Sequence, residues 1–278
     1  MKVAFFSVII PTLNEEKYLP TLLKSLTKQT YRGFEVILVD GKSDDKTTEI
    51  FQKFKPNFPA STILISEKRN VSYQRNLGAE SACGKYLVFL DADCEVDSTF
   101  LEELHIEAVK HNFPFATTWI RPDSNNTGDK LMLLVANLAQ ELAKGVNKPY
   151  AGGYNTIVKK EVFHKLKGFR EDLFMSEDYD LALRAKKKGY DLTILKEPQV
   201  VWSLRRFRSI GTLPALQKCT ESLTHVLLKG PITKEIFDYP MGGQAHEVKK
   251  KQIDLTKFKT YLKGIEKLEK KIDQLLES

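Results

Sequence analysis

Short apolar runs alternate with stretches of helical spacing over about the first 120 residues of the chain. Each run has the length and composition of a strand buried on both faces of a sheet. Parallel strands need crossover helices between them, so the alternation predicts an α/β domain with a mostly parallel central sheet flanked by helices. The predicted strands are Phe5–Ile10, Phe34–Asp40, Thr62–Ser66, Tyr86–Leu90 and Phe115–Ile120.

Amphipathic stretches predict the helices. The first should begin after Asn14 as its N-cap, with Glu15 and Glu16 in the first turn, where the helix dipole favours acids. The other predicted helices are Asp45–Phe54, Ser72–Ala82, Ser98–Lys110, Asp129–Lys144, Lys160–Leu166 and Glu177–Lys188. Three further strands are predicted at Tyr154–Val158, Leu192–Leu195 and Gln199–Trp202.

The alternation weakens after Trp119, which predicts one domain of residues 1–211 with two halves, 1–120 and 121–211. Residues 212–278 are predicted to form a helical extension. Pro214–Lys229 has proline in its first turn and glycine after its end, as helices favour. From about Leu255, apolar residues recur at helical spacing on a lysine-rich background, and packing on the chain's own domain is the commoner fate of so short a repeat. These residues are Phe258, Leu262, Ile265, Leu268, Ile272 and Leu275.

Composition narrows the functional classes. The net charge is +7, but no zinc-finger spacing, helix-turn-helix or RNA-binding aromatic motif accompanies it, so nucleic acid is not a predicted partner. The longest apolar stretches fall short of the ~20 residues that a membrane-spanning helix needs. Three cysteines without a CxxC are typical of a reducing compartment. We therefore expect a cytoplasmic protein.

The sequence YLVFLDAD, from Tyr86 to Asp93, is the strongest functional signal. A buried strand ends there in two carboxylates, Asp91 and Asp93, separated only by Ala92. Ligands of open α/β sheets bind at the carboxyl ends of strands. Two acids at such an edge suit a hard divalent cation held against a diphosphate, whereas an acidic pair alone is also common in solvated turns.

Four further segments carry candidate residues, each with a structural alternative. Thr12, Asn14 and Glu15 follow the strand that ends at Pro11, although a capped turn would also explain Asn14. Asp40 ends the next strand and can accept a hydrogen bond from a nucleotide base. Two helix starts follow. One carries Arg75, which can face a phosphate or form a surface salt bridge, and the other carries Glu177 and Asp178, acids that also compensate a helix dipole.

A fifth segment is VVWSLRRFRSIG, from Val200 to Gly211, where three arginines lie within four residues. A basic surface loop is one interpretation, and a segment that closes over a diphosphate is the other. Trp202 precedes the arginines, and Phe207 lies between Arg206 and Arg208. Beyond them, Pro214–Lys229 has an apolar face beside this basic segment, which is typical of a helix at an anionic membrane surface and equally of a helix packed on the domain.

Five segments, in order, resemble the inverting family-2 glycosyltransferases of the GT-A fold: SVIIPTLNEE, VILVDGKSDDKT, RNLGAESACGKYLVFLDAD, GGYNTIVKKEVFHKLKGF and SEDYDLALRAKKKGY. The resemblance covers about residues 5–210. The family's second motif is similar to VDDGSTDGT, so Asp40 matches its first acid and Lys42 stands where the family has a small residue. The chain lacks the QxxRW motif of processive synthases, which makes polymer synthesis a less favoured activity.

The resemblance implies roles for individual residues. Asp91 would face the ribose, Asp93 would bind Mn²⁺ or Mg²⁺ with Asp91 beside it, and Asp178 would be the catalytic base, with Glu177 orienting it or meeting the acceptor. Arg205 and Arg206 would contact the diphosphate. The implied nucleotide site comprises Pro11, Thr12, Asn14, Glu15, Asp40, Lys42, Ser43, Arg75, Asp91 and Ala92. The implied acceptor site comprises Trp119, Gly152, Gly153 and Glu177.

These residues suit a single displacement on a sugar donor of the UDP or GDP type. A cation stabilises the leaving diphosphate, and one base takes the proton of a hydroxyl on a saccharide or lipid-linked acceptor. A nucleotidyltransferase or a dinucleotide dehydrogenase would need a glycine-rich loop after the first strand, and PTLNEE contains no glycine. The alternative from another class is a non-catalytic module that binds sugar nucleotides or a membrane surface.

Overall fold

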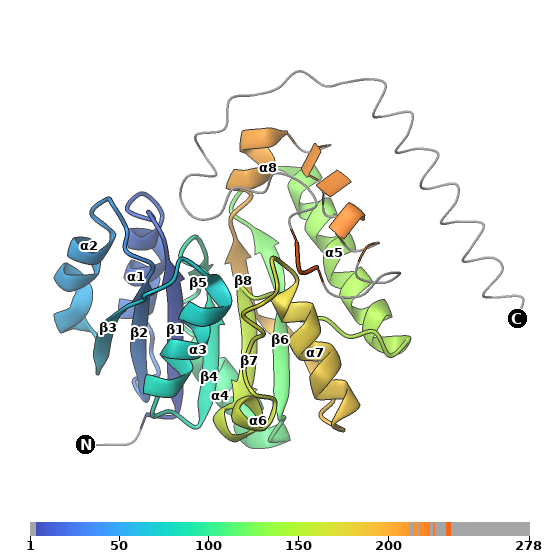
Figure 1. Cartoon of the computed structure of the whole chain (residues 1–278), viewed down its shortest axis with the longest axis horizontal. Coiled ribbons are helices and arrows are strands. Elements are labelled where there is room, and N and C mark those ends of the chain that lie inside the picture. Colours follow the sequence, from blue (N-terminus) through green and yellow to red (C-terminus); the bar gives the residue numbers. More distant parts are fainter. Residues whose placement is uncertain are drawn as a thin grey trace, which may run out of the picture.

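One eight-stranded sheet organises the described part of the computed structural model, which comprises residues 4–211, 214–215, 217–218, 220–222, 225 and 232–234. The strand order is β3-β2-β1-β4-β7-β6-β8-β5 (Figure 1). The strands are β1 (Phe6–Thr12), β2 (Phe34–Asp40), β3 (Ser61–Ile65), β4 (Tyr86–Leu90), β5 (Glu95–Val96), β6 (Phe115–Pro122), β7 (Asn155–Lys159) and β8 (Leu192–Trp202). Only β7 and β5 oppose the common direction, so the predicted mostly parallel sheet is confirmed.

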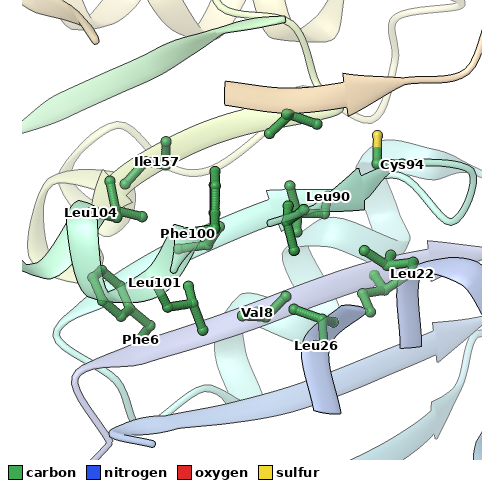
Figure 2. Packing of buried hydrophobic residues seen from close by; sticks show 14 of the residues in the cluster. Phe6, Val8, Leu22, Leu26, Leu90, Cys94, Phe100, Leu101, Leu104 and Ile157 are labelled. Atoms are coloured by element: carbon green, nitrogen blue, oxygen red, sulfur yellow. The ribbon is translucent and has the colours of Figure 1, made fainter. Parts of the chain in front are cut away.

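Helices cover both faces of the sheet, because alternate strand residues face opposite sides. In β1, Val8 and Ile10 join one core cluster and Ile9 joins the other. Figure 2 shows residues of the first cluster, among them Val8, Leu22, Leu90 and Leu104. Its helices are α1 (Leu19–Thr27), α2 (Thr47–Phe54), α4 (Phe100–His111) and α5 (Thr127–Gly145). The helices of the other face are α3 (Val71–Ser81), α6 (Lys160–Lys165) and α7 (Glu177–Lys187). Two further short helices are η1 (Lys55–Asn57) and α8 (Arg205–Ile210).

The prediction for the first helix is wrong at its start. α1 begins at Leu19 with Pro20 in its first turn, and its N-cap is Tyr18 rather than Asn14. Asn14 has a left-handed backbone with φ of 55°, and its side-chain oxygen accepts a hydrogen bond from the Asp44 N–H at 2.8 Å. Contacts with the neighbouring loop therefore outweigh the local preference of asparagine for the helix start.

Two other differences concern the last strands. The two strands predicted between Leu192 and Trp202 form a single strand, β8, whose register against β6 shifts between Thr118 and Ile120. The two-residue strand β5 follows the acidic pair and extends the sheet beyond β8. It is too short for a periodicity to reveal it.

Most of the predicted C-terminal extension lies outside the described residues. That includes half of the residues of Pro214–Lys229 and all of residues 255–278. Among the residues that the structure describes, no helix has both the length and the hydrophobicity needed to cross a membrane. The predicted peripheral membrane contact of residues 214–229 stays a prediction.

Candidate active site

One edge of the sheet collects most of the predicted site residues. β1, β2 and β4 are parallel and end there, with Thr12 opposite Asp40 in register. β7 is antiparallel to β4 and therefore begins at the same edge, where Asn155 pairs with Leu90. The loops before β7 and after β4 are thus brought together. This edge is where ligands bind in open α/β sheets.

The loops after β1 and β2 are joined by hydrogen bonds that the sequence pattern did not reveal. The backbone N–H groups of Asn14, Glu15 and Glu16 donate to side chains of the second loop, at 2.8 to 3.0 Å. The acceptors are Ser43, Thr47 and Asp45. The first loop is therefore fixed against the second, and the Glu15 carboxylate lies among the charges around Asp93.

Asp40 lies at the base of these loops and is 1% exposed. Its carboxylate accepts hydrogen bonds from the Thr12 hydroxyl at 2.9 Å, the Ser43 hydroxyl at 2.6 Å and the Ser43 N–H at 2.8 Å. The carboxylate therefore fixes the two loops to each other. Lys42, by contrast, is exposed with φ of 60°, and its carbonyl accepts a hydrogen bond from Arg69.

Arg75 connects the two acidic motifs. Its Nη2 lies 2.8 Å from Asp91 Oδ1, and its Nη1 lies 2.6 Å from Glu177 Oε1. The arginine side chain is 3% exposed and its Cζ lies 5.4 Å from the centre of the Phe169 ring. The sequence suggested either a phosphate ligand or a surface salt bridge. The structure shows a buried bridge that positions Asp91 and Glu177 relative to each other.

Asp178 lies beside this bridge at the start of α7. Its Oδ2 accepts a hydrogen bond from the Gly153 N–H at 2.8 Å, and its Oδ1 accepts one from the Tyr179 N–H at 2.7 Å. Burial and the neighbouring Glu177 carboxylate raise the pKa of Asp178 above the usual range, against those hydrogen bonds and Arg75. The preceding Ser176 has a left-handed backbone with φ of 65°. A buried carboxylate with a raised pKa at a sheet edge suits proton transfer.

Gly153 permits this arrangement, which gives a first prediction. A Cβ on Gly153 would lie 2.6 Å from both terminal nitrogens of Arg75. We expect Gly153→Ala to displace the guanidinium from its acids and to lower the free energy of unfolding by ~1–3 kcal/mol, as overpacking does. Urea unfolding measures the loss.

The matched control is Gly145→Ala at the end of α5, where a Cβ would meet no atom within 4 Å. It should leave stability unchanged or slightly raised. Equal unfolding curves for the Gly153 variant and wild type would show that Arg75 accommodates the methyl group.

Arg205 occupies the centre of a second charge cluster. Two of its nitrogens hydrogen-bond both Glu15 carboxylate oxygens, at 2.7 and 2.8 Å, and its Nε lies 2.8 Å from Asp93 Oδ2. Its Cζ also lies 4.2 Å from the centre of the Tyr18 ring. The predicted diphosphate arginine thus contacts the predicted metal ligand directly. The side chains of Arg205 and Glu15 are 10% and 6% exposed, and that of Asp93 is 12% exposed.

Acidic charge is concentrated around Asp93. Burial, and then the Asp91 and Glu15 carboxylates, raise the pKa of Asp93 to about 7, while Arg205 opposes the shift. Carboxylate oxygens are the ligands that Mg²⁺ and Mn²⁺ prefer, so Asp93 and Asp91 fit one divalent cation. In the part of the chain that the structure describes, no group of three or more His, Cys, Asp or Glu side chains could hold an ion. Substrate oxygens would therefore have to complete the coordination.

Of the other residues of the basic segment, Arg208 lies at the surface, and Trp202 and Phe207 lie in an aromatic group. Arg208 is 48% exposed and pairs with Asp123 through two nitrogens, at 2.6 and 2.8 Å. The Trp202 ring stacks on Tyr154 with centroids 5.0 Å apart, and the Phe207 ring packs edge-on against Trp202.

A cavity of about 420 Å³ adjoins Asp93 and Arg205. Its lining includes Tyr18, Glu95, Ser203 and Arg208.

The predicted acceptor residues do not all lie together. Gly152 and Gly153 precede β7 at the site edge, and Glu177 is held by Arg75. Trp119 lies within β6, where its indole N–H donates to Glu141 at 3.3 Å and its ring lies under Lys196. Neither of these contacts belongs to the acidic clusters. The structure therefore supports a place at the site for the glycines and Glu177 and gives none for Trp119.

A family model described as Glycosyl transferase family 2 matches residues 7–167, which is more than half of the chain. A protein of Haemophilus influenzae named an uncharacterized glycosyltransferase is 31% identical over 196 residues, 64% of this chain and 60% of that protein. A second relative, from Methanococcus voltae, is 28% identical over 209 residues, 68% of this chain and 63% of that protein. It is named a dolichyl N-acetyl-alpha-D-glucosaminyl phosphate 3-beta-D-2,3-diacetamido-2,3-dideoxy-beta-D-glucuronosyltransferase. The chain spans less than two thirds of the length of both relatives.

Solved structures share the fold at low sequence identity. Staphylococcus aureus TarS residues 1–349, in complex with UDP-GlcNAc, has a TM-score of 0.56 at 23% identity over 71% of this chain and 58% of that one. The mannosyltransferase PcManGT of Pyrobaculum calidifontis, in complex with GDP-Man and Mn²⁺, has a TM-score of 0.60 at 20% identity. That match covers 78% of this chain and 64% of the neighbour. The predicted GT-A type of α/β fold is thereby confirmed.

Proposed function

The chain belongs to glycosyl transferase family 2, and from that premise we propose that it is a metal-dependent inverting glycosyltransferase. It would move a sugar from a nucleoside-diphosphate-sugar to a hydroxyl of a saccharide or lipid-linked acceptor. The observation that carries the proposal is the Arg75 bridge, which holds Asp91 within one hydrogen-bonded group with Glu177, next to Asp178. Asp91, predicted to bind the donor, and Asp178, the candidate base, thus lie close together at the sheet edge.

The bond changes follow from one base and one displacement. The acceptor oxygen attacks the anomeric carbon, the bond from that carbon to the diphosphate oxygen breaks, and the acceptor proton passes to Asp178. Asp93, with Asp91, would hold a divalent cation, which when bound offsets the charge of the leaving diphosphate. A single displacement inverts the anomeric configuration.

The donor and acceptor classes rest on similar proteins. One structural neighbour is in complex with UDP-GlcNAc and another with GDP-Man and Mn²⁺, so we propose a donor of the UDP or GDP type and Mn²⁺ or Mg²⁺ as the cation. The Methanococcus voltae relative is named for a dolichyl N-acetyl-alpha-D-glucosaminyl phosphate acceptor, which supports a lipid-linked acceptor for this chain.

The first test is nucleotide release. The protein is incubated with UDP- and GDP-sugars, with Mn²⁺, Mg²⁺ or chelator, and with saccharide and lipid-phosphate acceptors. Product NMR reports the anomeric configuration. Release that depends on acceptor and cation supports the proposal. Donor binding without release by any combination would instead favour the non-catalytic sugar-nucleotide module.

Arg205 offers a second prediction at this site. We propose that in the donor complex its guanidinium exchanges Asp93 for diphosphate oxygens, because the arginine already lies against the predicted cation ligand. Arg205→Ala should lower kcat by ~10²–10³-fold, the usual effect of removing one electrostatic stabiliser of a leaving group or oxyanion. Steady-state kinetics with saturating donor measures the loss.

Arg121→Ala is the matched control, because Arg121 is 43% exposed and pairs with Asp97 on the surface, outside the cluster. It should stay within ~3-fold of wild type, as loss of a surface salt bridge usually does. Arg206→Ala completes the set. If both the Arg205 and Arg206 variants turned over like wild type, the segment would be a basic surface element only.

A further inference from the structure

Large exposed apolar side chains are concentrated on α5. Of the nine in the described residues, six lie on this helix or directly after it, with exposed fractions from 44% to 72%. The six are Leu131, Leu134, Val135, Leu138, Leu142 and Val146, named here the α5 stripe. At ~100° per residue they fall within an arc of about 120°, so they form one continuous apolar strip along the helix.

The opposite side of α5 attaches the helix to the domain, and it does so mainly through polar groups. The Asn137 side chain exchanges two hydrogen bonds with the backbone of Ile120, at 3.1 and 2.9 Å. The Gln140 amide donates to the Tyr150 carbonyl at 2.9 Å, and Leu133 is the buried apolar residue of that face. Surface helices normally turn their apolar face inward. In α5 the apolar face points outward, so packing within the described residues does not explain it.

We propose that the α5 stripe is the docking surface of the C-terminal segment of this chain, residues 255–278. The segment carries apolar residues at helical spacing from Phe258 to Leu275 on a lysine-rich background. α5 has 19 residues. At ~1.5 Å per residue α5 spans about 28 Å, and a helix from Phe258 to Leu275 would span about 27 Å. The α5 stripe itself, from Leu131 to Val146, covers about 24 Å of this length. Two strips of similar length can bury each other along most of their extent.

The course of the chain brings the segment within reach of α5. Ile232 forms a backbone bridge with Met175, accepts a hydrogen bond from the Phe174 N–H at 2.9 Å, and packs in a cluster beside Tyr150. Tyr150 is the residue that Gln140 of α5 contacts. About 20 residues separate Lys234 from Leu255. At up to ~3.3 Å per residue they can cross the length of α5.

An attached segment has an advantage over other occupants. When two binding partners are joined by a short linker, the effective concentration of one at the other is in the millimolar range. The charged side chains of α5 balance, since Asp129 and Glu141 offset Lys130 and Lys144, so the helix carries no net charge to repel a basic segment. A second copy of the chain or a lipid surface would have to compete with this internal partner.

Amide hydrogen exchange on the full chain tests the proposal without reference to activity. In wild type, amides of residues 258–275 should be protected at least 10-fold over the rates of an unstructured peptide. The double variant Leu138→Lys/Leu142→Lys should abolish that protection. Its matched control is Ile106→Lys/Val109→Lys on α4, two side chains that are 56% and 62% exposed. The control should keep the protection, and urea unfolding checks that both variants fold.

Four results would overturn the proposal. Unprotected amides in wild type, or protection that survives in the α5 variant, would mean that the segment does not dock there. A dimer in light scattering that the α5 variant alone dissociates would assign the stripe to a second copy. Pelleting with phosphatidylglycerol vesicles that the α5 variant alone loses would assign it to a lipid surface.

Discussion

Replacing Asp178 by asparagine is expected to lower kcat by ~10²–10⁴-fold, the usual contribution of general-base catalysis, with donor affinity retained. The carboxylate lies at the start of α7, beside the Arg75 bridge, and burial raises its pKa. Asparagine keeps the shape and one acceptor oxygen but removes the basic group. Single-turnover kinetics and donor titration separate chemistry from binding.

The substitution also has a structural cost that must be measured. Asp178 accepts backbone hydrogen bonds on both oxygens. In the asparagine variant, the side-chain NH₂ would face one of these N–H donors. The lost hydrogen bond should lower the free energy of unfolding by ~1–3 kcal/mol. Asp180→Asn is the control. Asp180 is a buried acid of the same helix turn that pairs with Arg184. An equal loss of kcat in that variant, or a loss confined to KM for Asp178→Asn, would contradict the role of base.

The Asp178 carboxylate also predicts how kcat depends on pH. A base acts only when ionised, so activity should be present above its pKa and lost as the pH falls through it. Because burial and Glu177 raise the pKa of Asp178, the acid limb of kcat should lie clearly above the ~4 of an ordinary aspartate. A limb near pH 4 would indicate a solvated carboxylate as the base.

The second large effect is expected for Asp93→Ala, which should abolish turnover and Mn²⁺ binding. Asp93 is nearly buried among the carboxylates of Asp91 and Glu15 and contacts Arg205. Without Asp93, the remaining acid of the pair has no partner at the strand end to hold a cation. Electron paramagnetic resonance of Mn²⁺ with and without nucleotide measures binding directly, apart from any assay of turnover.

The fold should survive this change, because Arg205 keeps its two hydrogen bonds with Glu15. Asp97→Ala is the control, since Asp97 is exposed and pairs with Arg121 on the surface. It should bind Mn²⁺ and turn over like wild type. Full activity of the Asp93 variant in chelator would remove the cation from the proposed mechanism.

Local patterns predicted the elements and the position of the site well. The run YLVFL had to be a buried strand, and its polar continuation placed Asp91 at the sheet edge. Sequence did not reveal which acids and arginines pair. Arg75 and Glu177 are 102 positions apart, and Arg205 and Glu15 are 190 apart. Periodicity reports only whether a position is buried, and an arginine near a motif most often lies on the surface.

The α/β class, the strands and the edge at which the acids gather can be predicted from the sequence, because apolar period and strand ends are local properties of the chain. Long-range contacts alone explain why β7 is antiparallel, why Asn14 binds the second loop instead of capping α1, and why α5 turns its apolar face outward. Each of these depends on partners distant in the sequence, whose contacts outweigh local preferences of a fraction of a kcal/mol to ~1 kcal/mol per residue.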